Sequence, residues 1–339
     1  MDLRVSISPL QRTIAGLVEG LLHSSMRVLI TGGAGFIGRH ICEHFQHRAE
    51  VRVPDNLRSG FESNLSGLKC QLIVGSILDR DVVKEVIKGV DFVFHLAAMV
   101  SVQQSVQKAN ECAEINAGGT VIVLEEAARA RVKKLIFSSS AAIYGDNPTI
   151  PKIETMPAEP KSPYATSKHE AERQCRSFTD QRRLATVSLR YFNVFGPYQN
   201  PRSEYSAAVP AFIEKAIRNE PITIFGDGRQ TRDFIYVKDV VAANALFALE
   251  SQATGIFNIA CGRPITITDL ALTIRDLAKS CSTIEYSAER PGDVKHSVAG
   301  VEKTQRAGFR PVCDLAGGLR ATIEFFRKDI AGIEHGRHL

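Results

Sequence analysis

The chain has 339 residues, of which 44% are hydrophobic and 23% charged, a composition typical of a globular enzyme with one or two domains. Its net charge is only +5 and it has no basic block, so we expect no nucleic-acid partner. The seven cysteines are scattered without a Cys-x-x-Cys pair, which predicts reduced thiols in a cytoplasmic protein and no metal site. No apolar run reaches the length of a membrane span, so we expect no membrane partner.

Residues 1–25 form an N-terminal extension that stands apart from the rest of the chain. Leucine and isoleucine recur there at helical spacing, behind a Ser8-Pro9 helix start. The segment lacks the charge pattern of a signal peptide. Met26 opens a strand as if the chain began at that point. A packed helix and an upstream start codon therefore both remain open.

Strand and helix patterns alternate from Met26 to about residue 195. The predicted strands cover residues 26–31, 50–55, 70–74, 91–98, 133–140 and 185–193, and the predicted helices cover 39–48, 79–89, 108–131 and 164–182. This alternation predicts a Rossmann-type α/β fold, a doubly wound parallel sheet over residues 26–195. After Gly196 the rhythm is lost. We expect a smaller mixed α/β substrate domain from residues 196–232 and 261–330, with segments near 233–260 returning to the first domain.

The glycine-rich stretch "TGGAGFIG" lies between the first predicted strand and the first predicted helix. Glycines such as Gly32 and Gly38 let a backbone approach a pyrophosphate, which would lie at the helix N-terminus. Asp55 ends the next strand, where a carboxylate can bind the adenosine ribose and repel a 2′-phosphate. The stretch therefore predicts NAD rather than NADP, although Arg52 and Arg58 could soften that preference.

A tyrosine and a lysine lie four residues apart in "SPYATSKHEAERQC". On a helix, Tyr164 and Lys168 share one face, and a nearby ammonium favours the phenolate. We therefore expect the pKa of Tyr164 to fall, which would make it a general base. Ser140 ends the fifth predicted strand, at the edge where ligands bind in such sheets, and could relay a proton to Tyr164.

These motifs occur in order along the chain, together with Asp55-Asn56, His95-Leu-Ala-Ala and Tyr191-Phe-Asn193. In this combination the chain resembles the extended short-chain dehydrogenase/reductases and, within them, the nucleotide-sugar 4-epimerases. The resemblance covers about residues 26 to 325. It implies a bound NAD, a UDP-sugar substrate and 4-epimerisation through a 4-keto sugar.

The resemblance also implies residue roles. Tyr164 would remove the proton of the sugar 4-hydroxyl, Lys168 would hold the nicotinamide ribose, and Ser140 would bind the 4-oxygen. The implied cofactor-binding residues are Gly32, Gly35, Phe36, Ile37, Gly38, Asp55, Asn56, Ser59, Gly60, Ser76, Ile77, Leu96, Ala97, Ala98, Asn116, Ser138, Tyr164, Lys168 and Tyr191. The implied substrate-binding residues are Ser101, Ser140, Tyr164, Asn193, Val209, Ile224, Phe225, Arg232, Arg290, Asp293 and Ser297. Ser76 stands where the family commonly has an acid for the adenine.

Three positions bear on the reaction and the sugar. Ala141 and Ala142 lie where dehydratases of the family carry acids, which favours simple epimerisation. Ser297 is small where the family varies between tyrosine and a small residue, which favours UDP-GlcNAc and UDP-GalNAc, with UDP-glucose and UDP-galactose as a weaker or equal activity. The positive charge and Arg202 keep UDP-glucuronate open. Another NAD-dependent dehydratase or reductase, and a non-catalytic dinucleotide-binding protein, remain alternatives.

The resemblance finally implies a homodimer. Residues 108–131 and 164–182 would supply two long helices per subunit to a four-helix bundle.

Overall fold

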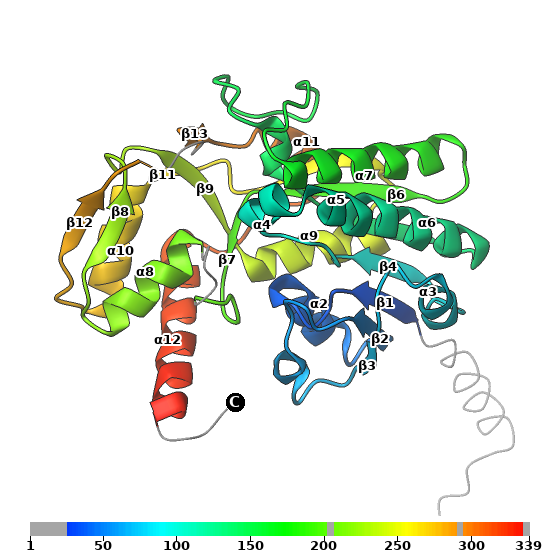
Figure 1. Ribbon diagram of the computed structural model, residues 1–339, viewed down its shortest axis with the longest axis horizontal. Helices are drawn as coiled ribbons and strands as arrows, with labels where there is room; N and C mark the ends of the chain where they lie inside the picture. Colours follow the sequence, from blue (N-terminus) through cyan, green and yellow to red (C-terminus); the bar gives the residue numbers. More distant parts are fainter. Residues whose placement is uncertain (1–25, 202–206, 290–293, 335–339) are drawn as a thin grey trace, which may run out of the picture.

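A seven-stranded parallel sheet forms the centre of the larger half of the molecule, on the right in Figure 1. The computed structural model describes residues 26–201, 207–289 and 294–334. The strand order across the sheet is β10-β6-β5-β4-β1-β2-β3. The strands are β1 Arg27–Thr31, β2 Glu50–Asp55, β3 Gln71–Val74, β4 Phe92–His95, β5 Lys134–Ser140, β6 Thr186–Tyr191 and β10 Gly255–Ile259. The order reverses at β1, as in doubly wound sheets, and confirms the predicted Rossmann-type fold.

Helices cover both faces of this sheet, which explains why its strands are nearly continuous apolar runs. On one face lie α2 Phe36–Phe45 and α9 Val237–Leu249, and on the other α3 Arg80–Val86, α6 Gly119–Arg129 and α7 Pro163–Asp180. Successive residues of a strand point to opposite faces. In β5, Ile136 packs toward α2 and α9, whereas Leu135 and Phe137 pack toward α6 and α7. A strand with two buried faces needs apolar residues at every position.

The predicted helix 108–131 is continuous but not uniform. It comprises α5 Ala109–Ala113, a π-helical turn at Glu114–Gly118 and α6, and a short unpredicted helix, α4 Val102–Gln107, precedes it. The wide turn contains Asn116, whose buried side chain bonds outside the helix. Such turns are common at functional sites.

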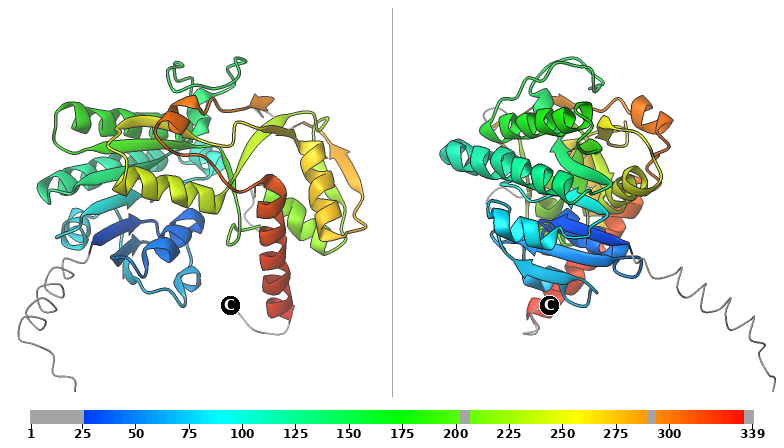
Figure 2. Two further views of the ribbon diagram at one scale, coloured as in Figure 1. Left: turned by 180° about the vertical axis from the view of Figure 1, so that it is seen from behind. Right: turned by 90° about the vertical axis from the view of Figure 1, so that its right-hand side faces the viewer.

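The smaller half, on the left in Figure 1, contains short strands and three longer helices. Its strands are β7 Asn193–Phe195, β8 Ile222–Phe225, β9 Thr231–Tyr236, β11 Pro264–Thr266, β12 Ile284–Ser287 and β13 His296–Ser297. Its helices are α8 Ala208–Ile217, α10 Ile267–Ala278 and α12 Leu315–Glu334. Their apolar faces and the strands β8 and β9 form a second core, and Figure 2 shows α12 extending beside α8.

Strand β9 connects the two halves. It pairs with β7, β11 and β13 in the small sheet, and α9, which follows it directly, packs on the large sheet. Short helical turns at Glu62–Leu65, Ala141–Tyr144 and Glu302–Arg306 complete the connections. Within the described ranges, no helix is long and apolar enough to span a membrane.

Candidate active site

The residues expected to bind the cofactor follow the carboxyl ends of neighbouring strands. Ser76 and Ile77 follow β3, and Asn56, Ser59 and Gly60 follow β2. The stretch from Gly32 to Gly38 follows β1, and Leu96 to Ala98 follow β4. Parallel strands end at the same edge of a sheet. The structure therefore places these segments along one edge, and the β5 serines lie next to them.

The glycine turn between β1 and α2 is tightly packed. Gly32 has a φ of +70°, and a Cβ there would lie 2.7 Å from the Ala97 nitrogen. A Cβ on Gly38 would lie 2.4 Å from the Gly32 oxygen, so only glycine lets α2 approach the turn. Helix α2 begins after Gly35 without a side-chain cap, which leaves its first N–H groups available to a phosphate. Phe36 and Ile37 lie in this first turn, and the arrangement fits the pyrophosphate of NAD.

Asp55 is buried at the end of β2, beside the glycine turn. Its Oδ2 accepts a hydrogen bond from the Ala34 nitrogen at 3.0 Å, and its Oδ1 accepts one from the Leu57 nitrogen at 2.9 Å. Asn56 caps the next turn by accepting from the Arg58 nitrogen at 3.2 Å. The carboxylate is thus fixed where the adenosine ribose is expected.

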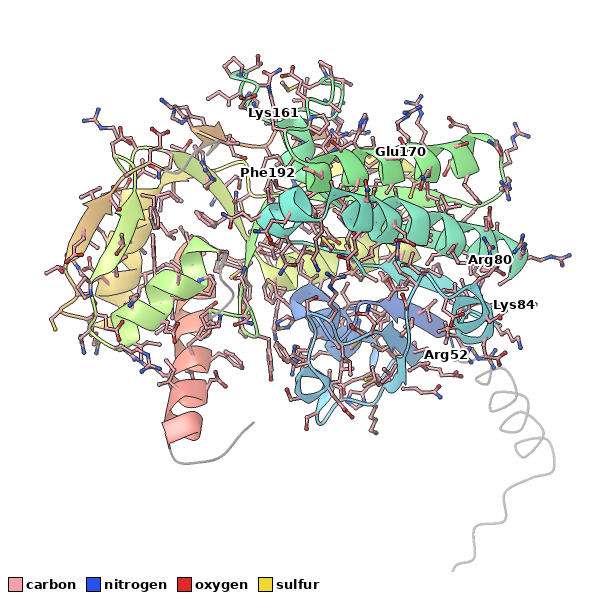
Figure 3. The ribbon with its side chains drawn as sticks, viewed as in Figure 1. Arg52, Arg80, Lys84, Lys161, Glu170 and Phe192 are labelled. Carbon is pink, nitrogen blue, oxygen red and sulfur yellow. The ribbon has the colours of Figure 1, made fainter. Side chains whose placement is uncertain are left out.

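The two arginines near Asp55 are both held by acids. Arg58 forms an ion pair with Glu111. Arg52 donates to Glu50 at 2.6 Å, and Figure 3 shows it on the side of the large half remote from the small half. Both arginines are already paired with acids, which agrees with NAD as the cofactor.

A neutral histidine connects β1, β4 and the π-helical turn. The Thr120 hydroxyl donates its hydrogen to the Asn116 carbonyl at 2.5 Å, so its oxygen must accept from His95 Nε2 at 3.0 Å. Because Nε2 holds the ring hydrogen, His95 Nδ1 accepts from the Thr31 hydroxyl at 2.7 Å. Burial, together with the charge of Lys168, lowers the pKa of His95 to about 3. From the sequence, Leu96 to Ala98 of this motif were expected to bind the cofactor, but His95 had no assigned role. The structure shows that this imidazole supports the cofactor edge.

Asn116 connects the segment after β4 to helix α7. Its amide nitrogen donates to the Met99 carbonyl at 3.0 Å and to the Ser167 hydroxyl at 2.9 Å, and its oxygen accepts from the Met99 nitrogen at 2.7 Å. Nearby, Ser101 caps α4 by accepting from the Gln104 nitrogen at 3.2 Å. Asn116 therefore supports the site mechanically, and its expected contact with the cofactor stays a prediction, as does the contact of Ser101 with the sugar.

The start of α7 is fixed in the way that the motif predicts. Ser162 accepts a hydrogen bond from the Ala165 nitrogen at 3.2 Å, and Pro163 occupies the first helical position. The Tyr164 nitrogen donates to the Ser105 hydroxyl of α4 at 3.1 Å. These contacts set where Tyr164 meets the sheet.

The structure brings together the three residues expected to be catalytic. The Tyr164 hydroxyl lies near Ser140 at the end of β5, close enough for the serine to favour the phenolate. Lys168, one turn later, donates from Nζ to the Ser138 carbonyl at 2.8 Å and lies 4.9 Å from the Phe137 ring centre. All of these groups lie at the carboxyl edge of the sheet, where the nicotinamide is expected.

The expected fall in the pKa of Tyr164 is wrong for the protein alone. Burial raises the pKa of Tyr164, and the nearby Ser140 only opposes this rise. The Lys168 ammonium is bound to the Ser138 carbonyl and does not offset the burial, which lowers the pKa of Lys168 itself to about 8. The sequence showed the spacing of the pair but could not show the burial of the phenol.

Ser138 and Tyr191 form a polar contact under the site. The Ser138 hydroxyl lies 3.1 Å from the Tyr191 hydroxyl, which also bonds the side chain of Asn244 on α9 at 2.8 Å. Burial raises the pKa of Tyr191 to about 12, so this phenol is neutral. The pair supports the end of β5, and its expected contact with the cofactor stays a prediction.

The expected sugar-binding residues lie along β9. Ser297 in β13 is the register partner of Arg232, whose Nη1 donates to the Thr231 carbonyl at 3.0 Å. Asn193 in β7 donates to the Asp233 carbonyl at 3.1 Å. Asn193, Arg232 and Ser297 therefore meet on adjacent strands although they are far apart in the sequence.

The expected uracil segment borders a cavity of about 430 Å³. Phe225 ends β8 beside it, and Gln230 donates to the Phe225 carbonyl at 2.7 Å. The cavity is lined by Gly226, Asp227, Arg229, Gln230, Glu289, Val294, Lys295 and His296. Ile224 and Val209 are buried in the second core, so any contact of theirs with a base stays a prediction. Arg290, Asp293 and Arg202 lie outside the described residues.

Comparison with known proteins gives matches over nearly the whole described chain. The model of the NAD-dependent epimerase/dehydratase family matches residues 28–260. A UDP-N-acetylglucosamine 4-epimerase from Methanobrevibacter ruminantium, solved with UDP-N-acetylmuramic acid, is 39% identical with a TM-score of 0.87, and the match covers 90% of this chain and 99% of that one. The UDP-glucose 4-epimerase of Thermotoga maritima, solved with UDP-glucose, is 38% identical with a TM-score of 0.86, covering 90% and 100%. The UDP-glucose 4-epimerase of Thermus thermophilus, solved with NAD, is 36% identical with a TM-score of 0.82, covering 89% and 99%.

The glycine turn, the fixed Asp55 and the grouping of Tyr164, Lys168 and Ser140 agree with these matches. The chain belongs to the NAD-dependent epimerase/dehydratase family of extended short-chain dehydrogenase/reductases, and it is an NAD-dependent isomerase of the nucleotide-sugar 4-epimerase type.

Proposed function

We propose that this protein interconverts UDP-N-acetylglucosamine and UDP-N-acetylgalactosamine, with UDP-glucose and UDP-galactose as weaker or equal substrates. One observation carries the chemistry. The Tyr164 hydroxyl lies near Ser140, one helical turn before Lys168, at the edge where the strands end. This arrangement suits removal of a proton from a sugar hydroxyl that is losing a hydride.

The residues would act in the following way. NAD, when bound, would supply the hydride chemistry and a positive charge in the site. Such a charge would oppose the burial that raises the pKa of Tyr164, so the phenol would become a base only in the loaded site. Ser140 hydrogen-bonds the 4-oxygen and passes its proton to Tyr164. After the sugar has turned over, Tyr164 returns the proton, so neither residue is changed at the end of the cycle.

The choice of sugar is argued from residues of the small half. Ser297 is the register partner of Arg232 on β9. Its side chain is smaller than a tyrosine, and we propose that a 2-acetamido group would take the place that a tyrosine would fill. The relative from Methanobrevibacter ruminantium acts on UDP-N-acetylglucosamine, which supports the same choice. UDP-glucuronate is the competing substrate, and Arg202, which suggested it, lies outside the described residues.

Two alternative functions, a dehydratase and a non-catalytic dinucleotide-binding protein, fit the site residues less well. A dehydratase needs acids after Ser140, and this chain has Ala141 and Ala142 in a short helical turn there. A non-catalytic dinucleotide-binding protein would not need the grouping of Ser140, Tyr164 and Lys168.

We also propose a cytoplasmic homodimer. All seven cysteines are free thiols, as expected in a reducing compartment. The helices α5 and α6 lie against α7 and would form one half of a four-helix bundle (Figure 1). Sedimentation of the purified protein would test the dimer.

The function is tested by proton NMR of the purified protein with UDP-GlcNAc, UDP-glucose or UDP-glucuronate, without added NAD. We expect the anomeric signal of UDP-GalNAc to appear in the first reaction. Conversion of UDP-glucose alone would keep the chemistry and contradict the interpretation of Ser297. Conversion of UDP-glucuronate alone would contradict the proposed substrate, and no conversion even with added NAD would contradict the proposed function.

A further inference from the structure

A buried ion pair lies directly behind the proposed catalytic residues. Arg190 of β6 donates from Nε to Glu172 Oε1 at 2.9 Å and from Nη2 to Oε2 at 2.7 Å. Only 3% of the Arg190 side chain and 2% of the Glu172 side chain are exposed. Two parallel hydrogen bonds between a guanidinium and a carboxylate fix direction as well as distance.

The pair has two further contacts, and both belong to β5 or the turn that follows it. The Ser139 hydroxyl donates to Glu172 Oε1 at 2.5 Å, and Ser139 is the register partner of Arg190. The Arg190 guanidinium lies 4.7 Å from the ring centre of Tyr144, in the turn after Ser140. One ion pair therefore contacts α7, β5, β6 and this turn.

Helix α7 meets β5 in a ladder of three contacts, each one helical turn from the next. Tyr164 lies near Ser140, Lys168 bonds the Ser138 carbonyl, and Glu172 bonds the Ser139 hydroxyl. Of the three, only Glu172 is also bound by a second strand through an ion pair. A shift of α7 by one residue would rotate it by about 100° and break all three contacts.

We infer that the Glu172–Arg190 pair is a positioning device that sets the rotation and height of α7 over β5, and thereby holds Tyr164 against Ser140. Neither residue is placed to touch substrate or cofactor, so both act through Tyr164 and Lys168. A general contribution to stability is a poor explanation, because a buried ion pair is often no more stabilising than apolar residues of similar size. The inference rests on the proposed function for its assay.

A double variant separates positioning from stability. Arg190→Met or Glu172→Leu alone leaves an unpaired buried charge and should lower the melting temperature strongly. Glu172→Leu/Arg190→Met removes both charges, so it should recover most of the lost melting temperature. We expect the double variant to lose kcat by roughly 10- to 100-fold while the KM for the UDP-sugar stays within about twofold, since the base but not the sugar site is displaced. Crystal structures of the parent and of this variant should show the Tyr164 hydroxyl farther from Ser140 in the variant.

A matched control is available in the large half. Glu126 of α6 is also buried, with 3% of its side chain exposed, and it pairs with Arg80 of α3 at 2.7 Å. Figure 3 shows Arg80 at the edge of the large half remote from the small half. The variant Arg80→Met/Glu126→Leu should change the melting temperature but leave kcat unchanged.

Arg190→Lys gives an independent test if the double variant does not fold. It keeps the charge but not the two parallel bonds, and it should retain more kcat than Arg190→Met. The inference is overturned if the folded double variant has the parent kcat, or if Arg190→Lys lowers the melting temperature without changing kcat. If the parent itself epimerises no UDP-sugar, the proposed function fails, and the position of Tyr164 in the variant crystal structure still decides the inference.

Discussion

The two halves of the molecule hold their expected site residues in different ways. In the large half, most expected residues lie at or just after the carboxyl ends of strands of one parallel sheet, and the others lie on helices that pack on it, so their places follow from the order of the chain. In the small half, Asn193, Arg232 and Ser297 come from separate short strands that meet only through β9. The chemistry therefore depends on local motifs, whereas the pocket for the sugar depends on long-range packing.

One buried carboxylate holds the small half together at this point. Asp233 accepts hydrogen bonds from the nitrogens of Cys261 at 3.0 Å, Gly262 at 2.8 Å and Ala299 at 3.2 Å. Its side chain is fully buried next to Arg232. It connects β9 to the segments before β11 and after β13.

Because the two halves hold different parts of the site, variants in the large half should change the reaction rate, and variants around β9 should change which sugar is bound.

The largest expected effect is in the large half. Tyr164→Phe removes the proposed base and should lower kcat by about 10²- to 10⁴-fold. The glycine turn and Asp55 are untouched, so the affinity for NAD, measured by calorimetry, should stay within about twofold. An unchanged kcat would contradict the assignment of Tyr164 and remove the proposed division between the halves.

The next effect is in the small half. Ser297→Tyr should fill the space proposed for the acetamido group, so kcat/KM for UDP-GlcNAc should fall roughly 10- to 200-fold relative to UDP-glucose. The matched variant Ser297→Ala should keep the parent ratio. If tyrosine lowers kcat/KM for both sugars equally, Ser297 does not select the sugar.

The pH dependence of kcat should depend on Lys168 in the large half and not on residues of the small half. Burial lowers the pKa of Lys168 to about 8, so its ammonium is present below that pH and is lost as the pH rises through it. We expect kcat at saturating UDP-sugar to fall about tenfold between pH 7 and pH 9. Ser297→Ala should have the same profile. A flat profile over this range would show that the reaction does not need the Lys168 charge.

The smallest effect concerns the connection within the small half. Asp233→Asn places an amide N–H₂ against backbone N–H groups, which should cost about 1–3 kcal/mol of the free energy of unfolding. We expect the KM for the UDP-sugar to rise several-fold while the affinity for NAD is unchanged. A change in NAD affinity alone would contradict the separation of the two halves.

The match between sequence and structure follows the same division. The parallel sheet, the glycine turn and the capped start of α7 were predictable because strand runs, glycines and Ser-Pro act over a few residues. The sequence did not predict the π-helical turn at Asn116, whose side chain bonds Met99 outside the helix. It did predict that segments near 233–260 return to the first domain, but not that β10 pairs with β6 at the edge of the large sheet.

The sequence by itself determined the fold class, the cofactor edge and the spacing of Tyr164 and Lys168, because hydrophobic period and short motifs are local properties. Only the tertiary structure decided the protonation of these groups, because burial raises the pKa of Tyr164 and lowers that of Lys168. It also decided that Glu172 meets Arg190, since β6 follows α7 in the chain but lies beside β5 in the sheet. Burial and strand neighbours arise only when distant segments pack together, so no pattern within one segment contains them.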